Sequence, residues 1–174
     1  MIAEKEALEL LKRYVDNEKT IKHCLGVAEV AFEIATKINQ KNPSLGINPE
    51  KVKIAALLHD IGRAKEGVHE FNTVEILENE GLADLAKIAF HGFVYESALL
   101  KGEKELDKYL PFSIENKIIV IADMHYNQKG QNVNLKERFA DIKERYKDDK
   151  DFLEILKLAK PRMEKLEKEI NDLM

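Results

Sequence analysis

IAALLHDIGR, residues 54–63, ends an apolar run with a histidine and an aspartate. His59 and Asp60 therefore follow residues that belong in a hydrophobic core, where an unpaired ionised carboxylate is costly to bury. A carboxylate in such a place needs hydrogen bonds, a cationic partner or a metal ion. The stretch predicts a polar pocket inside the core of the fold.

Two other stretches repeat this pattern. Asp123 follows the apolar run IIVIA, residues 118–122, and His91 follows KIAF, residues 87–90. Polar residues at the ends of separate apolar runs predict helices that converge on one pocket. Imidazole and carboxylate suit a divalent transition metal, or magnesium where carboxylate and water predominate. Cys24 is the one cysteine, which excludes a thiolate-clustered zinc site and an internal disulfide.

Apolar spacing outward from this stretch predicts an all-α fold, a single-domain bundle of roughly seven to nine helices over residues 1–174. The β-branched run 118–121 is also compatible with a buried strand, but we favour a helix. Pro161 is expected to break or kink the last helical stretch. The expected helical segments are 3–15, 20–39, 48–62, 72 or 73 to 79, 82–90, 113–124 and several between 134 and 174.

Composition excludes several classes of function. Hydrophobic residues make up 44% of the chain and charged residues 34%, which is typical of a compact soluble protein. A net charge of -4 with interleaved signs offers no broad basic surface, so we expect no large nucleic acid partner. The apolar runs are too short to span a bilayer, and the amino terminus lacks the pattern of a signal peptide, so we expect cytoplasmic residence without membrane binding.

The order of these residues resembles a known family. His23, then His59-Asp60 within AALLHDIGR, then Asp123 within IVIADMH is similar to the HD-domain superfamily of metal-dependent phosphohydrolases, in its HDIG variant. The resemblance covers roughly residues 20–126, and residues 134–174 cover or extend that core. It implies a helical domain of the HD type in which these four residues hold a divalent metal ion.

Two further histidines match the subset of that superfamily with two metal ions. His69 lies in VHEFNTVEIL and His91 in IAFHG. The resemblance implies that they hold a second metal, with Asp60 bridging the two ions. Surface exposure or a contact with substrate is the alternative for each histidine. The resemblance does not decide whether one or two ions bind. It also does not decide which of Mn, Fe, Co, Mg and Zn is bound.

Three departures from the family pattern narrow the activity. A glycine often stands four residues after the third histidine, and Thr73 stands there in this chain, which we expect to alter backbone packing. The Gly-Tyr-Pro signature of cyclic-dinucleotide phosphodiesterases is replaced by residues 92–94, Gly-Phe-Val. The paired acids of alarmone hydrolases are missing from residues 61–64. Both activities are therefore disfavoured.

The function implied is hydrolysis of a small nucleotide-like phosphoester or phosphoanhydride through a metal-bound hydroxide. Asp60, Arg63 and Lys65 are the candidate catalytic residues; the two cations are either phosphate contacts or part of a solvated loop. The alternatives are a di-iron oxygenase of the HD type and a metal- and nucleotide-binding module without turnover. The expected partner is a small phosphorylated or nucleotide substrate.

The sequence also supports expectations for residues near the motifs and near the carboxyl terminus. His125 is expected at the surface, turned away from Asp123. Cys24 is expected to be a small buried hydrophobe rather than a nucleophile. A near-heptad apolar stripe allows a homodimer seam formed by Leu156, Met163, Leu166, Ile170 and Leu173.

Overall fold

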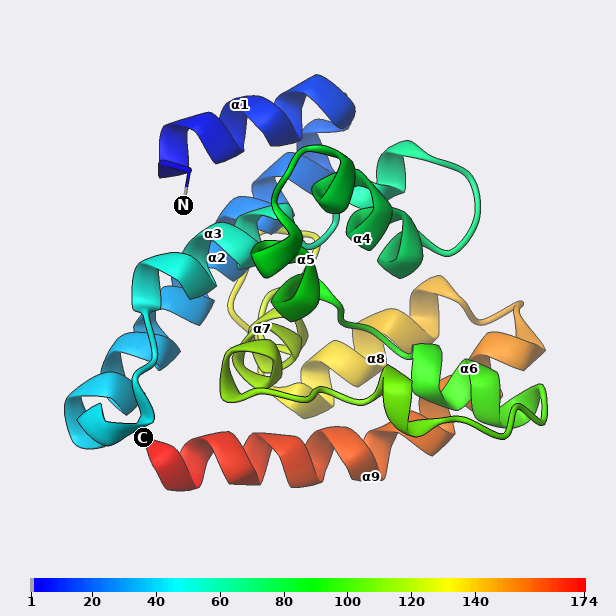
Figure 1. The fold of residues 1–174 in the computed structure, drawn as a ribbon. Helices are drawn as coiled ribbons and strands as arrows, with labels where there is room; N and C mark the ends of the chain where they lie inside the picture. The colour runs from blue at the N-terminus through cyan, green and yellow to red at the C-terminus, as the bar shows by residue number, and fades with distance from the viewer. Residues whose placement is uncertain (1) are drawn as a thin grey trace.

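Residues 2–174, which the computed structural model describes, form nine α-helices and no β-strand (Figure 1). The prediction of an all-α fold is confirmed. A single isolated bridge joins Tyr126 to Asn132 within this part of the chain. The helices are α1 (Glu4–Tyr14), α2 (Glu18–Lys41), α3 (Pro49–Leu58), α4 (His69–Asn79), α5 (Ala83–Ala89), α6 (Val94–Leu100), α7 (Ile114–Met124), α8 (Leu135–Arg145) and α9 (Lys150–Leu173).

Side-chain caps begin most of the long helices. Asn17 accepts from the backbone N–H groups of Lys19 and Thr20 at the start of α2. Asn48 caps α3, whose first residue is Pro49. Ser113 accepts from the backbone of Asn116 and starts α7, so the ambiguous run 118–121 is helical. Each cap satisfies N–H groups that the helix cannot pair internally.

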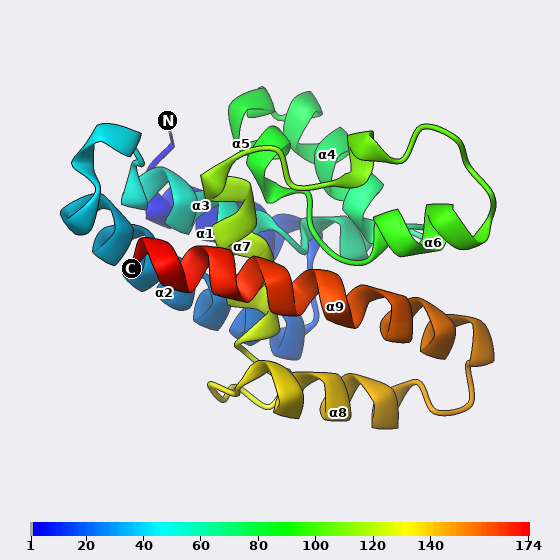
Figure 2. The same cartoon turned by 90° about the horizontal axis from the view of Figure 1, so that it is seen from below.

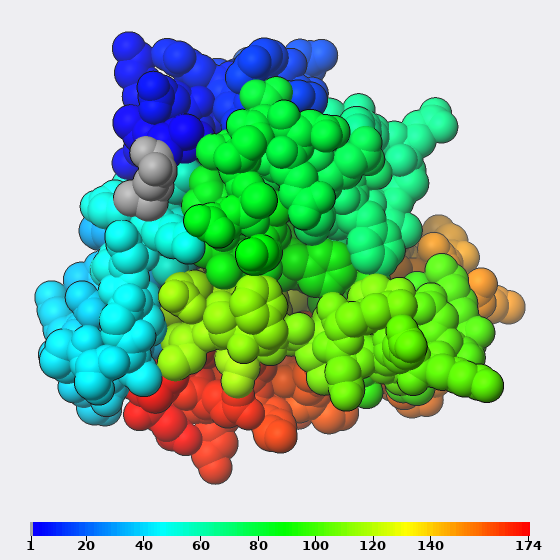
Figure 3. Space-filling view, viewed as in Figure 1, coloured from blue at the N-terminus to red at the C-terminus, as the bar shows by residue number. Residues whose placement is uncertain are grey.

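The core lies between α2, α3, α5 and α7. α2 packs against α3 on one side and α7 on another, and α5 contacts both α3 and α7. α1 covers α3 at one end of the molecule and α9 covers the opposite end, blue and red in the space-filling view (Figure 3). Because α2 is enclosed by several neighbours, its buried face is wide and includes His23 and Cys24.

α9 runs across α7 and contacts α6 on one side and α8 on the other (Figure 2). Most of the apolar stripe that was predicted as a dimer seam points into this interface. Leu156, Met163, Leu166 and Ile170 are all buried within the chain. The seam prediction was therefore wrong, because the stripe closes the core of the same molecule.

Pro161 lies inside α9 and does not end the helix. The prediction of a break was wrong for a local reason. Pro161 is exposed, so the carbonyl left without its helical partner faces water. Buried residues on either side of it, Ala159 and Met163, hold the helix on the core. No helix within residues 2–174 has the length and apolar content that crossing a bilayer requires.

Two helix boundaries and one whole helix also differ from the sequence prediction. α3 ends at Leu58, and a 3-10 helix, Ile61–Ala64, follows the His-Asp pair. α4 begins at His69 instead of Asn72 or Thr73. α6 was not predicted, because a helix of seven residues has little intrinsic stability and depends on its tertiary contacts.

Candidate metal centre

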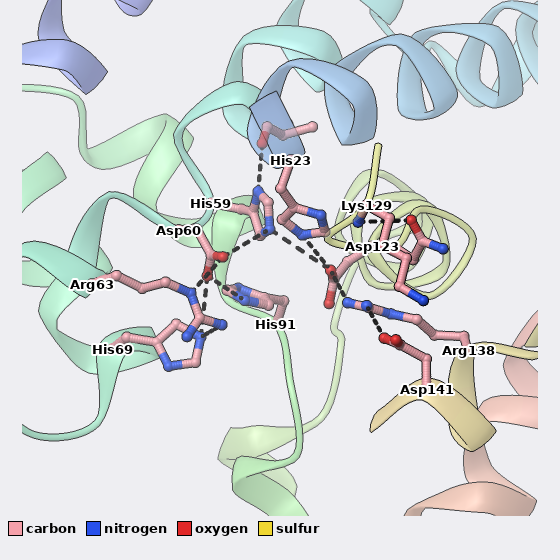
Figure 4. Close-up of polar contacts among 12 residues, drawn as sticks. His23, His59, Asp60, Arg63, His69, His91, Asp123, Lys129, Arg138 and Asp141 are labelled. Carbon is pink, nitrogen blue, oxygen red and sulfur yellow. Dashed lines mark hydrogen bonds and ion pairs between the residues drawn. The ribbon is translucent and has the colours of Figure 1, made fainter. Parts of the chain in front are cut away.

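The six candidate ligands come from five separate parts of the chain and meet at one place (Figure 4). His23 lies on α2, His59 and Asp60 follow the end of α3, and His69 is the first residue of α4. His91 lies in the connection between α5 and α6, and Asp123 lies in the last turn of α7. The apolar residues that directly precede His59, His91 and Asp123 in helices α3, α5 and α7 are buried and bring these polar ends together, as the sequence predicted.

The side chains form three overlapping groups of possible metal ligands. In each group one ligand atom from every member lies within 4.8 Å of the others. His59 and Asp60 each belong to two groups, and so does His91, so the groups make one continuous centre. The groups are His23 with His59 and Asp60, His59 with His91 and Asp123, and Asp60 with His69 and His91.

Hydrogen bonds orient three of the imidazoles. The Nδ1 of His59 lies 2.7 Å from the carbonyl oxygen of Ala56 and that of His91 lies 3.1 Å from the carbonyl oxygen of Ala89. A carbonyl oxygen only accepts, so both Nδ1 atoms carry a proton, and Nε2 is the nitrogen that each ring turns toward the centre. His69 is held differently, because its Nε2 accepts a hydrogen bond from Arg63 over 3.1 Å.

Asp60 is the hub of the centre. Its side chain is 2% exposed, and its Oδ1 lies 3.2 Å from His69 Nε2 and 3.4 Å from His91 Nε2. Neither contact gives Oδ1 a hydrogen-bond partner, and His59 Nε2 is also buried without one. Unpaired buried polar atoms that face one another are costly unless a cation lies between them. The donor set therefore fits a divalent metal ion.

The pKa values follow from this crowding. Burial lowers the pKa of His59 to about 3, so its imidazole is neutral at pH 7. Burial also acts to lower the pKa of His91, but the Asp60 carboxylate, 3.4 Å away, outweighs it and raises the pKa to about 9. Burial acts to raise the pKa values of Asp60 and Asp123, yet the surrounding histidines and arginines hold both well below their usual value. Both carboxylates are therefore ionised.

Asp123 has a partner that the sequence did not reveal. Its Oδ1 lies 2.9 Å from His23 Nε2 and accepts from Arg138 Nη2 over 3.2 Å. Arg138 is 4% exposed and lies on α8, between the buried residues Leu135, Phe139 and Ile142. One signal was present in the sequence, because a charged residue occupies an apolar-face position of an amphipathic helix.

Thr73 and Gly62 bring α4 against the His-Asp turn. The Thr73 hydroxyl donates to the carbonyl of His59 over 2.8 Å and accepts from the N–H of Gly62 over 3.0 Å. A Cβ atom at Gly62 would lie 2.0 Å from the carbonyl oxygen of His69, so the close approach requires glycine. The departure from the family glycine therefore adds two buried hydrogen bonds.

The remaining candidates lie at different distances from the centre. Arg63 is close, since its Nε donates to Asp60. Lys65 is exposed and pairs with Glu75 over 2.9 Å, so the structure does not bring it to the centre. His125 points away from the centre, as predicted, but is half-buried because it contacts Glu167 on α9 over 2.7 Å. Cys24 is buried, and burial raises the pKa of its thiol well above the ordinary value.

The centre opens into a cavity of about 400 Å³. Four centre residues reach its wall: His23, His69, His91 and Asp123. The α8 and α9 side contributes cations and large apolar groups. These residues are Arg138, Ile142, Arg145, Tyr146, Phe152 and Ile155. A concave site with convergent polar groups beside apolar walls is typical of a small-molecule site.

The helical fold, together with a buried centre of histidines and aspartates beside a cavity, is typical of metal-binding helical proteins. The model of the HD domain family matches residues 20–127, and the chain belongs to this family. This membership places it in the superfamily of metal-dependent phosphohydrolases, whose members bind divalent metal ions.

Comparison with curated proteins finds a similar sequence in an archaeon. Uncharacterized protein MJ0778 of Methanocaldococcus jannaschii is 38% identical over 125 residues, which cover 68% of this chain and 72% of that protein. No solved structure matches the chain at a significant level.

Proposed function

We propose that this protein is a hydrolase that cleaves a phosphoester or phosphoanhydride bond in a small nucleotide-like substrate. The observation that carries the proposal is the convergence of six ligand-type side chains, four of which reach the wall of a cavity of about 400 Å³ that also presents arginines. Divalent ions held there supply a nucleophile at neutral pH and neutralise charge on the phosphoryl group.

The ligands divide into two overlapping sets. His23, His59, Asp60 and Asp123 would hold one ion, and the neutral, preoriented Nε2 of His59 fits this role. His69 and His91, together with Asp60, would hold a second ion. The two hydrogen bonds from Thr73 keep the start of α4, and with it His69, against Asp60.

Arg63 is the cation nearest the centre and would bind a phosphate oxygen. Its guanidinium donates to Asp60 and His69, and the residue lines the cavity. Charge-assisted hydrogen bonds from arginine suit the planar spread of phosphate oxygens. Lys65 has no such position, since it is engaged with Glu75 outside the cavity wall.

Metal reconstitution tests the proposal directly. Protein stripped with a chelator is supplied with Mn, Co, Fe, Mg or Zn, and phosphate release is measured on a panel of nucleotides. We expect turnover that depends on the added metal, and its loss in Asp60→Asn, which keeps the size of the side chain and removes its charge. Asp172→Asn, at an exposed position of α9, is the matched control and keeps full turnover.

Two results would contradict hydrolysis. Turnover by Asp60→Asn at the wild-type rate would exclude the centre from the reaction. Nucleotide binding without phosphate release under any of the five metals would identify a binding module instead. Iron analysis and spectroscopy of anaerobically purified protein test the di-iron oxygenase, which needs a redox-active ion.

A further inference from the structure

One wall of the cavity carries an ordered pair of arginines on α8. Arg138 and Arg145 both contact the carboxylate of Asp141, which lies between them on the same helix. Asp141 Oδ2 accepts from Arg138 Nη1 over 3.5 Å and from Arg145 Nε over 3.2 Å. Both arginines line the cavity, and this helix lies beyond the residues that match the family model.

Arg138 has donor capacity that the protein leaves unused. The guanidinium has five N–H donors, and burying it is costly unless they are paired. The Arg138 side chain is 5% exposed, its two hydrogen bonds are made through Nη1 and Nη2, and Nε is buried without a partner in the described part of the chain. A buried, incompletely paired cation beside Asp123 fits an anionic ligand.

Arg145 lies farther from the centre. It follows Arg138 by seven residues on an α-helix, which separates their backbone positions by about 10 Å along the axis. Arg145 reaches Asp141 through Nε, and its guanidinium lies 5.5 Å from the ring centre of Tyr146. Its side chain is 29% exposed, at the outer part of the same wall.

Apolar groups fill the wall between and beyond the two arginines. Ile142 lies between them on the cavity side of α8, and Tyr146 packs against Phe152 with ring centres 4.3 Å apart. Such a surface accepts the ring of a sugar or a base rather than a hydrated chain of charges. The two cations therefore share the carboxylate of Asp141, and the apolar groups form the cavity surface beside them.

We propose that Arg138 and Arg145 select substrates that carry two anionic groups separated by an apolar body. Arg138 binds the phosphoryl group at the metal centre, and Arg145 binds a second anionic group at the outer part of the same wall. A nucleoside bisphosphate, with one phosphate on each side of the sugar, has this chemistry. The inference rests on the proposed function for the identity of the cleaved phosphoryl group. The binding of the second anionic group does not depend on the proposed function.

The other charged groups of the cavity do not supply an equivalent pair. Arg63, Lys101, Glu70 and Glu103 also line it, and Arg63 is engaged with Asp60 and His69 at the centre. Glu70 Oε2 lies 3.2 Å from His69 Nδ1, and Glu103 accepts from the hydroxyl of Tyr109. These carboxylates come from the α4 and α6 side of the cavity. An anionic substrate is therefore attracted most strongly to the cavity wall that α8 forms.

The test compares two probes, adenosine 3′,5′-bisphosphate and adenosine 5′-monophosphate. Binding is measured by calorimetry and phosphate release by kinetics, on the metal-loaded full chain. We expect the bisphosphate to bind at least about tenfold more tightly, and Arg145→Gln to remove most of that difference while leaving the monophosphate unchanged. Arg145→Lys keeps the charge and retains part of the preference. Lys143→Gln removes a charge from an exposed position of the same helix, outside the cavity wall, and is the matched control.

The outcomes separate this inference from the proposed function. Phosphate release with equal affinity for both probes, or an equal loss for both in Arg145→Gln, would overturn the inference and leave hydrolysis intact. Arg145-dependent preference for the bisphosphate without phosphate release would overturn hydrolysis and support the inference. A loss in Lys143→Gln as large as in Arg145→Gln would show general charge attraction and overturn the assignment of Arg145.

Discussion

Replacing Thr73 with valine tests how the fold holds the metal centre. The hydroxyl of Thr73 is fully buried and makes two hydrogen bonds, to the carbonyl of His59 and from the N–H of Gly62. Valine has nearly the same shape, so the change removes these bonds with little change in packing. It leaves a backbone donor and a backbone acceptor buried and unpaired, which costs about 1–3 kcal/mol for each group. We expect the free energy of unfolding to fall by about 2–4 kcal/mol.

Thr36 on α2 provides a matched control. Its hydroxyl is buried and has no hydrogen-bond partner in the described part of the chain. Thr36→Val is the same chemical change in a helix, but it removes no hydrogen bond. We therefore expect a neutral or slightly stabilising effect. The difference between the two variants isolates the contribution of the Thr73 bonds.

Urea denaturation followed by far-ultraviolet circular dichroism measures both variants. Metal-free protein is used first, so that ligand binding does not contribute to stability. The metal-loaded protein then gives the stoichiometry, and we expect Thr73→Val to weaken the second ion more than the first, because His69 lies one helical turn before Thr73. Thr73→Val and Thr36→Val midpoints that coincide, with equal slopes, would refute the reasoning.

Three further predictions concern other parts of the molecule. His91 has a pKa of about 9 in the metal-free protein, so an ion that binds it displaces a proton, and metal affinity falls as pH decreases below 9; calorimetry in buffers of different ionisation enthalpy detects the released proton. Arg162→Met leaves the carboxylate of Glu96, 1% exposed, without its bidentate partner, and we expect urea denaturation to show a loss of about 3–5 kcal/mol. Pro161→Ala restores a backbone donor inside α9, and we expect it to raise the thermal midpoint by contributing roughly 1–3 kcal/mol.

The centre was predictable because metal ligation restricts residue type. A histidine or an aspartate that directly follows a buried apolar run needs a partner that offsets the cost of its burial. This pattern occurs in residues 54–63 and in residues 118–123. Five of the six ligand candidates lie at or beyond the end of a helix or in a connection, where the chain turns toward the shared pocket. The convergence of His59, Asp60, His91 and Asp123 could therefore be inferred from local sequence, whereas His23 and His69 were identified only through the family resemblance.

The elements that failed in prediction are those governed by distant contacts. α6 is short, and Arg162 of α9 holds it by pairing with Glu96 while also donating to the carbonyl of Gly92. Nothing near residues 94–100 indicates this partner. α9 likewise keeps Pro161 because its core contacts outweigh one lost hydrogen bond. Helix propensity and proline rules describe isolated segments, and tertiary packing overrode both.

The position of the two α8 arginines at the cavity could not be predicted from the sequence for a different reason. Metal ligands are short side chains that must point at one place, so they leave a fixed order of residue types. An arginine reaches an anion from many backbone positions, and Arg138 and Arg145 are two of 28 basic residues in the chain. Residues that choose a substrate can therefore lie outside the matched region 20–127 while the residues of the centre lie inside it. In this chain the family core supplies the centre, and α8 and α9 supply one wall of the cavity beside it.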